Sequence, residues 1–376
     1  MQFDLDPEVV HLNHGAFGAA PRVVGDAGSR WRAAAEANPY RFHRAVVPGA
    51  VVEARAAAAA FLHVGADDIG LVRNVSEGVA TVLAALDLRP GDEVVHSDHA
   101  HGGVRLSLEA ACRRADARAV LVDVPLPAAG AEVVEAFADA VTRRTRLVLL
   151  DHITSVSASL LPVAEVARAV KAAAPDALVL VDAAHVPGHV DVDPSTLGAD
   201  FWTGNLYKWA FTPRGSGVLW VAAQHRDSLV PLVPSWGADE PFPAPWDHPG
   251  TQDWASWLSI PAALEFFGEI GGWERVRRSS ELVQAGQAHV AEALGTDLTG
   301  LPGCPAPCMR LVRLPDGVVE GPGDVRDLYL RLSTEFAVEA GPVWFKGEGL
   351  VRFSGQVYND PGDYERLADA LVTACA

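Results

Sequence analysis

The chain has 376 residues, of which 49% are hydrophobic, and a formal net charge of −18 at pH 7. This length exceeds one compact core of usual size, so two domains are expected. The negative charge opposes general affinity for nucleic acid or for an anionic membrane, because phosphate binding requires a basic surface, but it allows one local basic pocket for a small anion.

The N-terminal residues and the cysteines predict a cytoplasmic protein. Residues 1–6 are acidic and contain no basic region followed by an apolar one, so no secretion signal is expected. No run of about eighteen apolar residues predicts a membrane-spanning helix. Four cysteines are too few for a disulfide scaffold, and Cys304 and Cys308 lack the second pair that would complete a metal site.

Helical and strand-like segments alternate from about residue 50 to residue 225. Helices are predicted at 51–62, 76–86, 104–115, 133–142 and 163–174. Strands are predicted at 69–72, 93–96, 119–122, 147–150, 178–181 and 217–221. Ser76 is a candidate N-cap for the helix that it begins. Continuous apolar strands that alternate with helices indicate an α/β fold with a mostly parallel sheet buried on both faces.

The second half of the chain has a different pattern. Residues 229–256 are rich in proline and tryptophan and predict an ordered irregular segment, because tryptophan is costly to leave exposed. A long helical pattern follows over 256–294 and is interrupted at Gly271-Gly272. The last eighty or so residues predict a smaller α+β unit, with strands near 309–313, 336–339 and 350–354.

Several polar residues closely follow a predicted strand or open the next helix. They are Ser76, His99, His101, Asp182 and His185. Ligands of open parallel sheets bind beyond the carboxyl ends of the strands, so these residues are expected along one edge of the sheet.

Lys208 is one of only three lysines, against 27 arginines. It lies on a predicted loop downstream of Asp182, which ends an apolar strand. A lysine and an acid in this arrangement can form a pyridoxal phosphate site, in which the lysine makes the Schiff base and the acid keeps the pyridine nitrogen protonated. The alternatives are a surface lysine near a turn and an aspartate that caps the strand end.

The start of a helix near residue 75 and a cluster of histidines are further candidates. At Asn74–Gly78 the N–H groups of a helix N-terminus and the Ser76 hydroxyl would suit a phosphate, although an ordinary N-cap is the alternative. His96, His99 and His101 suggest zinc, but alternate strand residues point to opposite faces and no fourth ligand is evident. A histidine ring that stacks on a cofactor is favoured, with His101 ahead of His99, and plain surface histidines remain the alternative.

Two residues in the second half of the chain complete the candidate site. Thr251 follows the segment rich in proline and tryptophan, and its hydroxyl could reach a phosphate, with an ordinary turn as the alternative. Arg352 lies on an otherwise apolar strand and is expected to pair with an acid, either a protein carboxylate or that of a substrate.

Six motifs distributed almost end to end carry a family resemblance. They are His11–Gly18 (HLNHGAFG), Asp151–Ser155 (DHITS), Asp182–His185 (DAAH), Gly204–Trp209 (GNLYKW), Gly250–Asp253 (GTQD) and Val351–Ser354 (VRFS). Together they resemble the isopenicillin N epimerase-like branch of the class V aminotransferases, which are fold-type I pyridoxal phosphate enzymes. The resemblance implies an N-terminal segment (1–20) near the active site, a large cofactor-binding domain (21–255) with a seven-stranded type of sheet, and a long helix with a small C-terminal domain (256–376).

The resemblance also implies a role for each matching residue. The catalytic residues would be Lys208 as the Schiff-base lysine and Asp182 as the partner of the pyridinium, together with His101, the ring favoured above for stacking on the cofactor. His185 would lie near the ring oxygen, Val75, Ser76, Asn205 and Tyr207 would bind the phosphate, and Thr251 would reach the cofactor of the neighbouring subunit in a homodimer. Arg352 would hold the substrate α-carboxylate, and Asn13 and His14 would contact the substrate or cap a turn. Tyr207 departs from the pattern, because relatives usually carry histidine before the lysine, but a phenol can still donate to phosphate.

The sequence favours some reactions of this family over others but does not identify a single one. A small-molecule amino acid is the expected substrate. Cysteine desulfurases of this superfamily carry a cysteine on a loop before the carboxylate-binding arginine, and residues 337–351 contain none. Epimerisation requires a second acid/base, which the sequence does not identify, whereas β-elimination requires only Lys208 and a good leaving group. A C–S lyase or an epimerase of a modified amino acid is therefore expected, with transamination third and a non-catalytic ligand-binding homologue also open.

Overall fold

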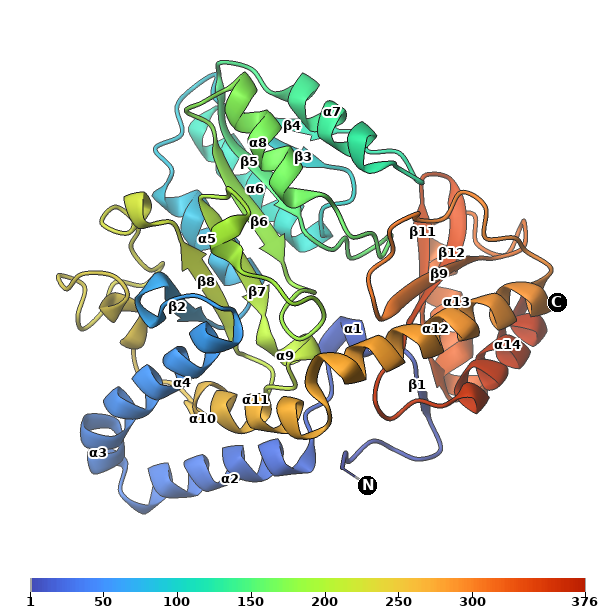
Figure 1. Ribbon diagram of the computed structural model, residues 1–376, viewed down its shortest axis with the longest axis horizontal. Coiled ribbons are helices and arrows are strands. Elements are labelled where there is room, and N and C mark those ends of the chain that lie inside the picture. Colours follow the sequence, from blue (N-terminus) through green and yellow to red (C-terminus); the bar gives the residue numbers. More distant parts are fainter. Residues whose placement is uncertain (1, 376) are drawn as a thin grey trace.

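A seven-stranded sheet dominates the computed structural model, which describes residues 2–375 (Figure 1). Its strands, in spatial order, are β2 (Ile69–Val72), β8 (Gly217–Val221), β7 (Phe201–Asn205), β6 (Leu178–Ala183), β5 (Thr145–Asp151), β3 (Glu93–Ser97) and β4 (Arg118–Val122). Only β8 runs antiparallel to its neighbours, and the other pairings are parallel. The expected α/β fold with a mostly parallel sheet is confirmed.

Helices cover both faces of this sheet. They are α4 (Val47–Phe61), α5 (Val75–Ala85), α6 (Gly102–Ala115), α7 (Gly130–Ala140) and α8 (Val163–Ala173). Alternate residues of one strand enter different hydrophobic clusters: Val148 packs with residues of α7 and α8, whereas Leu149 packs with residues of α5 and α6. This alternation, which follows from the two-residue period of a strand, buries the sheet on both sides.

Further helices lie below the large sheet in Figure 1, and the last of them extends to the C-terminal part. They are α2 (Arg22–Ala37), α3 (Pro39–Arg41), α10 (Ala255–Leu258), α11 (Ile260–Glu269) and α12 (Gly272–Leu294). The helical pattern expected over 256–294 is interrupted at Gly271 and Gly272, which adopt φ angles of 105° and 54°. Only glycine accepts this left-handed region at little cost, so the chain can change direction before α12.

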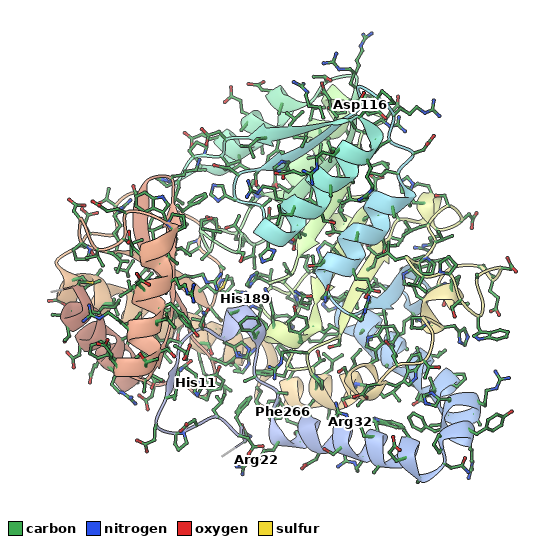
Figure 2. The ribbon with its side chains drawn as sticks, turned by 180° about the vertical axis from the view of Figure 1, so that it is seen from behind. His11, Arg22, Arg32, Asp116, His189 and Phe266 are labelled. Atoms are coloured by element: carbon green, nitrogen blue, oxygen red, sulfur yellow. The ribbon has the colours of Figure 1, made fainter. Side chains whose placement is uncertain are left out.

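A smaller antiparallel sheet lies at the far end of α12. It consists of β11 (Gly341–Phe345), β12 (Glu348–Ser354) and β9 (Met309–Arg313), and it packs with α13 (Pro322–Glu335) and α14 (Pro361–Cys375). The N-terminal β1 (Val10–His11) pairs in parallel with β10 (Val338–Glu339), and α1 (His14–Phe17) follows it. Figure 2 shows His11 beside this C-terminal part, so the first residues of the chain are held by residues near its end.

Single-turn helices occupy several connections. They are Phe42–Val46, Ala66–Asp68, Pro194–Thr196, Ala223–His225 and Ala244–Asp247, and α9 (Leu206–Trp209) is similarly short. Within residues 2–375, no helix combines the length and the apolar character needed to cross a membrane.

Candidate active site at the carboxyl edge of the large sheet

Three buried polar residues end adjacent strands of the large sheet. Asp151 ends β5, Asp182 lies near the end of β6, and Asn205 ends β7. The register places Asp151 directly beside Asp182. His185 follows β6, and Lys208 lies on α9 directly after β7. The strand order therefore gathers these side chains at one edge, as the sequence predicted for Asp182 and His185.

Lys208 is buried, and no carboxylate of residues 2–375 forms an ion pair with it, unlike the other two lysines of the chain. Its Nζ lies 2.9 Å from Nε2 of His185. Burial, assisted by the positive charge of Arg352, lowers the pKa of the Lys208 amine to about 7, although Asp182 acts in the opposite direction. Lys171, by contrast, pairs with Asp200, and Lys346 pairs with Asp98 and Asp123. A buried amine with this pKa can accept a proton at neutral pH.

Two carboxyl groups lie side by side at the base of the site. Burial raises the pKa of Asp182 and, together with the negative charge of Asp182, raises the pKa of Asp151 well above its usual range. One oxygen of Asp182 accepts a hydrogen bond of 2.9 Å from the backbone N–H of Ala184. Oδ2 of Asp151 is buried without a partner. The negative charge of an ionised Asp182 opposes ionisation of Asp151, so Asp151 remains neutral when Asp182 is ionised.

The N-terminus of α5 lies against the end of β7. Asn205 Oδ1 accepts a hydrogen bond of 2.9 Å from the backbone N–H of Val75. The expected N-cap, Ser76, is wrong: the cap is Asn74, whose side chain accepts from the N–H of Glu77 at 3.0 Å. Ser76 instead occupies the first turn, with an exposed side chain. Its hydroxyl and its backbone N–H are therefore available to an anion, whereas the N–H groups of Val75 and Glu77 already donate to Asn205 and Asn74.

Arg352 of β12 reaches this edge from the smaller sheet. Its guanidinium donates to the carbonyl oxygen of Ser155 and, at 3.0 Å, to Oδ1 of Asn13. Burial lowers the pKa of Arg352 to about 10, so it stays cationic at neutral pH. No protein carboxylate pairs with it among residues 2–375, and its charge is therefore available to an anionic ligand.

His14 also lies close to Lys208, but both of its ring nitrogens are occupied. Nε2 donates to the backbone carbonyl of Lys208 at 2.6 Å, and Nδ1 accepts from the hydroxyl of Tyr358 at 2.9 Å. The ring of His189 stacks on the ring of Trp209, the residue after Lys208, with the ring centroids 4.1 Å apart. Figure 2 shows His189 at the junction between the two parts of the molecule.

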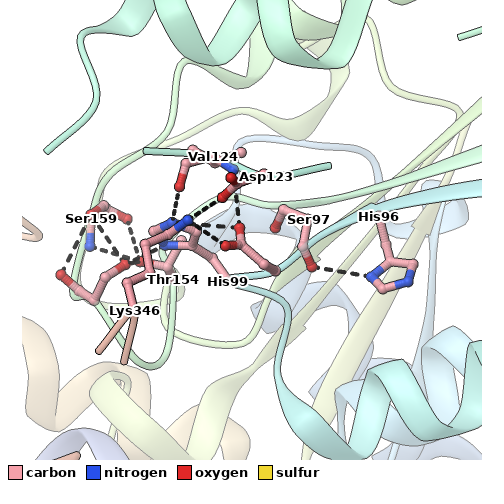
Figure 3. Close-up of polar contacts among 10 residues, drawn as sticks. His96, Ser97, His99, Asp123, Val124, Thr154, Ser159 and Lys346 are labelled. Carbon is pink, nitrogen blue, oxygen red and sulfur yellow. Dashed lines mark hydrogen bonds and ion pairs between the residues drawn. The ribbon is translucent and has the colours of Figure 1, made fainter. Parts of the chain in front are cut away.

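The two histidines considered for stacking have different environments. Nε2 of His99 donates to the carbonyl of Val124 at 2.9 Å, and Nδ1 accepts from the hydroxyl of Ser157 at 2.7 Å. Figure 3 shows this enclosed ring, with His96 lying apart from it. His101 is exposed at the start of α6, and its ring is free to cover a ligand. Within residues 2–375, no group of three histidine, cysteine, aspartate or glutamate side chains is arranged to hold a metal ion.

The two further residues predicted to bind the phosphate, Tyr207 and Thr251, occupy different places relative to Lys208. Tyr207 is half-buried beside Lys208, and burial, with the charge of Asp182, raises the pKa of its phenol. Thr251 is exposed and lines a separate cavity with His43, Arg44 and Trp236. The structure therefore places Tyr207 next to Lys208, whereas Thr251 also lines a cavity with Arg73 and Glu77, near the start of α5.

Two residues that the sequence did not single out contribute to this region. Asp151 was part of a quoted motif but received no role; the strand-end rule that selected Asp182 would also have selected it. Tyr358 lies between α14 and β12, 344 positions away from its partner His14. No local pattern indicates such a contact, because it depends on how the two ends of the chain meet.

Comparison with known proteins identifies relatives along the whole chain. The family model for aminotransferase class-V matches residues 19–308. A putative L-cysteine desulfhydrase 1 of Oryza sativa subsp. japonica is 33% identical, over 96% of this chain and 82% of its own length. Isopenicillin N epimerase of Streptomyces clavuligerus is 31% identical, over 98% of this chain and 95% of its own.

Solved structures share the same architecture. The cystine C–S lyase C-DES, solved with its product cysteine persulfide, matches with a TM-score of 0.83 and 20% identity over 97% of this chain and 98% of its own. The cysteine desulfurase CsdA of Escherichia coli matches with a TM-score of 0.78 and 21% identity over 99% and 96%. The fold is that of fold-type I pyridoxal phosphate enzymes, and this chain belongs to the aminotransferase class-V family.

Proposed function

We propose that the protein binds pyridoxal phosphate through Lys208 and cleaves a C–S bond of a cysteine-related amino acid by β-elimination. The observation that carries this proposal is the buried Lys208 amine, which has a pKa lowered to about 7 by burial and lies 2.9 Å from His185. When bound, the cofactor supplies an electron sink for negative charge that develops at the substrate Cα.

The residues at the edge of the sheet fit this cofactor. Nδ1 of His185 is buried without a partner, which suits a polar group of a bound ring. Asp182 is buried and carries a carboxyl group that a protonated ring nitrogen would satisfy. Val75 and Ser76 begin α5, where the hydroxyl and N–H of Ser76 suit a phosphate. Asn205, which accepts from the Val75 N–H, and Tyr207 border the same turn.

Different residues of the protein would bind the substrate, remove its proton and exclude water. Arg352 and Asn13, already joined at 3.0 Å, would hold the substrate α-carboxylate and so orient the bond between Cα and its hydrogen. Lys208 would remove that proton, since its amine is neutral above a pH of about 7. His101 would cover the exposed face of the cofactor and limit the access of water.

Elimination is favoured over the other reactions of the family for a chemical reason. Epimerisation requires a second acid/base opposite Lys208, whereas the phenol of Tyr207, which lies beside Lys208, would be engaged by the phosphate. Desulfuration requires a nucleophilic thiol on the loop before the carboxylate-binding arginine, and residues 337–351 contain no cysteine. Cys304 is exposed but lies earlier in the chain, and burial raises the pKa of the Cys308 thiol to about 12. The 31% identity to an isopenicillin N epimerase keeps epimerisation as the second candidate.

Incubation with cysteine, cystine or thioether amino acids in deuterated water separates these reactions. Elimination predicts pyruvate and a sulfur product, epimerisation predicts deuterium at Cα with inversion, and transamination predicts a keto acid that retains the sulfur. We expect pyruvate, and we expect its formation to stop in Lys208→Ala. Absence of both pyruvate and Cα deuteration with all substrates would contradict the proposal.

We also propose a homodimer, in which Thr251 reaches the phosphate of the neighbouring subunit's cofactor. Its exposed position supports this arrangement, because an exposed hydroxyl is free to reach a neighbouring subunit. Mixed dimers of Lys208→Ala and Thr251→Ala protomers would contain one site that carries both changes and one that carries neither. Activity that reappears on mixing supports the shared site, and activity that stays at the level of the separate variants argues against it.

A further inference from the structure

The N-terminal segment His11–Gly18 connects the two parts of the molecule at the candidate site. Its strand β1 pairs with β10, and the backbone N–H of Leu12 donates to the carbonyl of Glu339 at 3.0 Å. The backbone N–H of His14 donates to Oγ of Ser354 at 2.9 Å, and that hydroxyl donates to the carbonyl of Leu12 at 2.9 Å. The backbone on either side of Asn13 is therefore fixed to β12.

The side chains of Asn13 and His14 reach different residues of the site. Asn13 accepts from Arg352, which lies on β12 two positions before Ser354. His14 donates to the carbonyl oxygen of Lys208 at 2.6 Å. One dipeptide thus joins the arginine expected to hold the substrate to the lysine expected to hold the cofactor.

The protonation state of His14 is fixed by its surroundings. Burial lowers the pKa of the His14 ring to about 3, so the ring is neutral at physiological pH. The carbonyl of Lys208 can only accept, which places the single ring proton on Nε2. Nδ1 then accepts from the hydroxyl of Tyr358, whose pKa is raised by burial so that it keeps its proton. Neither ring nitrogen is left for a substrate.

Close packing of the α1 backbone also holds this helix against the turn that carries Lys208. Gly18 ends α1 with a φ of 69°, and a Cβ at this position would collide with the carbonyl oxygen of Tyr207. A Cβ on Gly15 would lie 2.8 Å from Sδ of Met309 and 3.1 Å from the ring of Trp209. Helix α1 can approach the Lys208 turn this closely only because both residues lack a side chain.

We propose that His14 is a positioning residue, which holds the backbone of Lys208 so that its amine stays beside His185 and in register with Arg352. This inference rests on the proposed function of Lys208. Proton transfer from Cα depends on placement of the amine to within a fraction of an ångström, and a shift of about 1 Å costs up to about a hundredfold in rate.

Two matched substitutions separate the contact with Lys208 from the contact with Tyr358. In His14→Gln the amide nitrogen occupies the place of Nε2 and can still donate to the carbonyl of Lys208. In His14→Asn the shorter side chain can reach only the place of Nδ1, near Tyr358. Both changes remove the ring and leave a polar amide, so their effects on folding are comparable.

The test measures kcat, KM and the pH at which the visible band of the bound cofactor changes, in the holoenzyme. We expect His14→Asn to lower kcat by up to about a hundredfold, with a smaller change in KM, and to shift the pH of the spectral transition. His14→Gln should retain a clearly larger kcat and a transition near that of the wild type.

Equal behaviour of the two variants, whether both are impaired or neither is, would overturn the positioning role. A wild-type protein that shows no visible band would instead overturn the proposed function itself. The two failures are therefore distinguishable in one set of samples.

Discussion

At the scale of single residues, the site is built from groups whose charge is changed by burial. Lys208 loses its proton easily because it is desolvated, and Arg352 adds a second, electrostatic cause. Asp151 and Asp182 lie side by side at one edge of the sheet. Ionisation of Asp182 opposes ionisation of Asp151, so the two residues together carry about one negative charge. Each of these groups is costly to bury, and such costs are typical of residues that a ligand later satisfies.

Replacement of Arg352 by methionine tests the electrostatic part of this account. Because the Lys208 pKa is lowered to about 7 by burial and by Arg352, the amine is protonated below that pH and reactive above it. Loss of the arginine charge removes only the second cause, so the pKa should rise but remain below its ordinary value. Cofactor uptake by cofactor-free Arg352→Met, followed against pH, should have its midpoint at higher pH than the wild type.

The matched control for that experiment is Arg313→Met on the adjacent strand β9. Arg313 pairs with Glu348 and is not among the charges that act on Lys208. Its removal should leave the midpoint of cofactor uptake unchanged. If both variants shift equally, the effect comes from the net charge of the protein rather than from Arg352.

At the scale of elements, the site depends on the contact between α1 and α9. Gly18→Ala would force a side chain against the Tyr207 carbonyl in addition to the cost of a left-handed φ, which is about 1–2 kcal/mol for a non-glycine residue. We expect lower thermal stability and weaker cofactor retention, because α9 carries Lys208. Thermal unfolding and the intensity of the visible band measure these two effects.

Gly91→Ala is the control for the cost of a left-handed φ, as distinct from the collision of a side chain with the backbone. Gly91 has a φ of 85°, but no atom lies within 4 Å of an added Cβ. It should lose stability without any loss of cofactor retention. A Gly18→Ala protein that behaves like Gly91→Ala would show that the close packing of α1 on α9 does not matter for the site.

The elements also show what a sequence can and cannot predict. Apolar runs such as 147–150 and 178–181 predicted their strands because they are buried on both faces. Strand β7 was missed because Phe201–Asn205 contains threonine, glycine and asparagine and lacks an apolar run. Gly204 is required there, since a Cβ would lie 2.7 Å from the rings of Pro187 and Trp202. Lys208 consequently follows a strand, on a short helix rather than a loop.

Single-residue predictions succeeded or failed for a similar reason. Asp182 and Lys208 could be found because a strand end and a rare residue type are visible in the sequence. The N-cap was assigned to Ser76 instead of Asn74 because both residue types cap helices well, and only the backbone decides between them. The partners of His14 lie 194 and 344 positions away, one of them a backbone carbonyl, and no residue pattern encodes such a contact.

At the scale of the whole molecule, a second connection joins the smaller sheet to the large one. Lys346, in the turn between β11 and β12, lies 2.5 Å from Oδ2 of Asp98 and also pairs with Asp123. Figure 3 shows Lys346 reaching the loops that carry Asp123 and His99. The next residues of the chain form β12, which carries Arg352, so we expect these ion pairs to influence the substrate binding that we propose for Arg352.

Lys346→Met should therefore raise KM more than it lowers kcat. The pair is partly exposed, so its loss should cost no more than about 1 kcal/mol and raise KM by no more than about fivefold. Added salt should raise the KM of the wild type towards that of the variant. Lys171→Met is the control: it breaks the ion pair with Asp200, which precedes β7, and should leave KM unchanged. An equal rise of KM in both variants would show that the ion pairs of Lys346 have no specific effect on substrate binding.

The central claim is that Lys208 holds the cofactor, and the chain's three lysines allow one direct measurement. The purified protein is treated with borohydride, digested and analysed by mass spectrometry for a pyridoxyl group. We expect a visible absorption band that borohydride bleaches, the added mass on Lys208 alone, no band in Lys208→Ala and an unchanged band in Lys171→Ala. A band that persists in Lys208→Ala, or a pyridoxyl group on Lys171 or Lys346, would contradict the account.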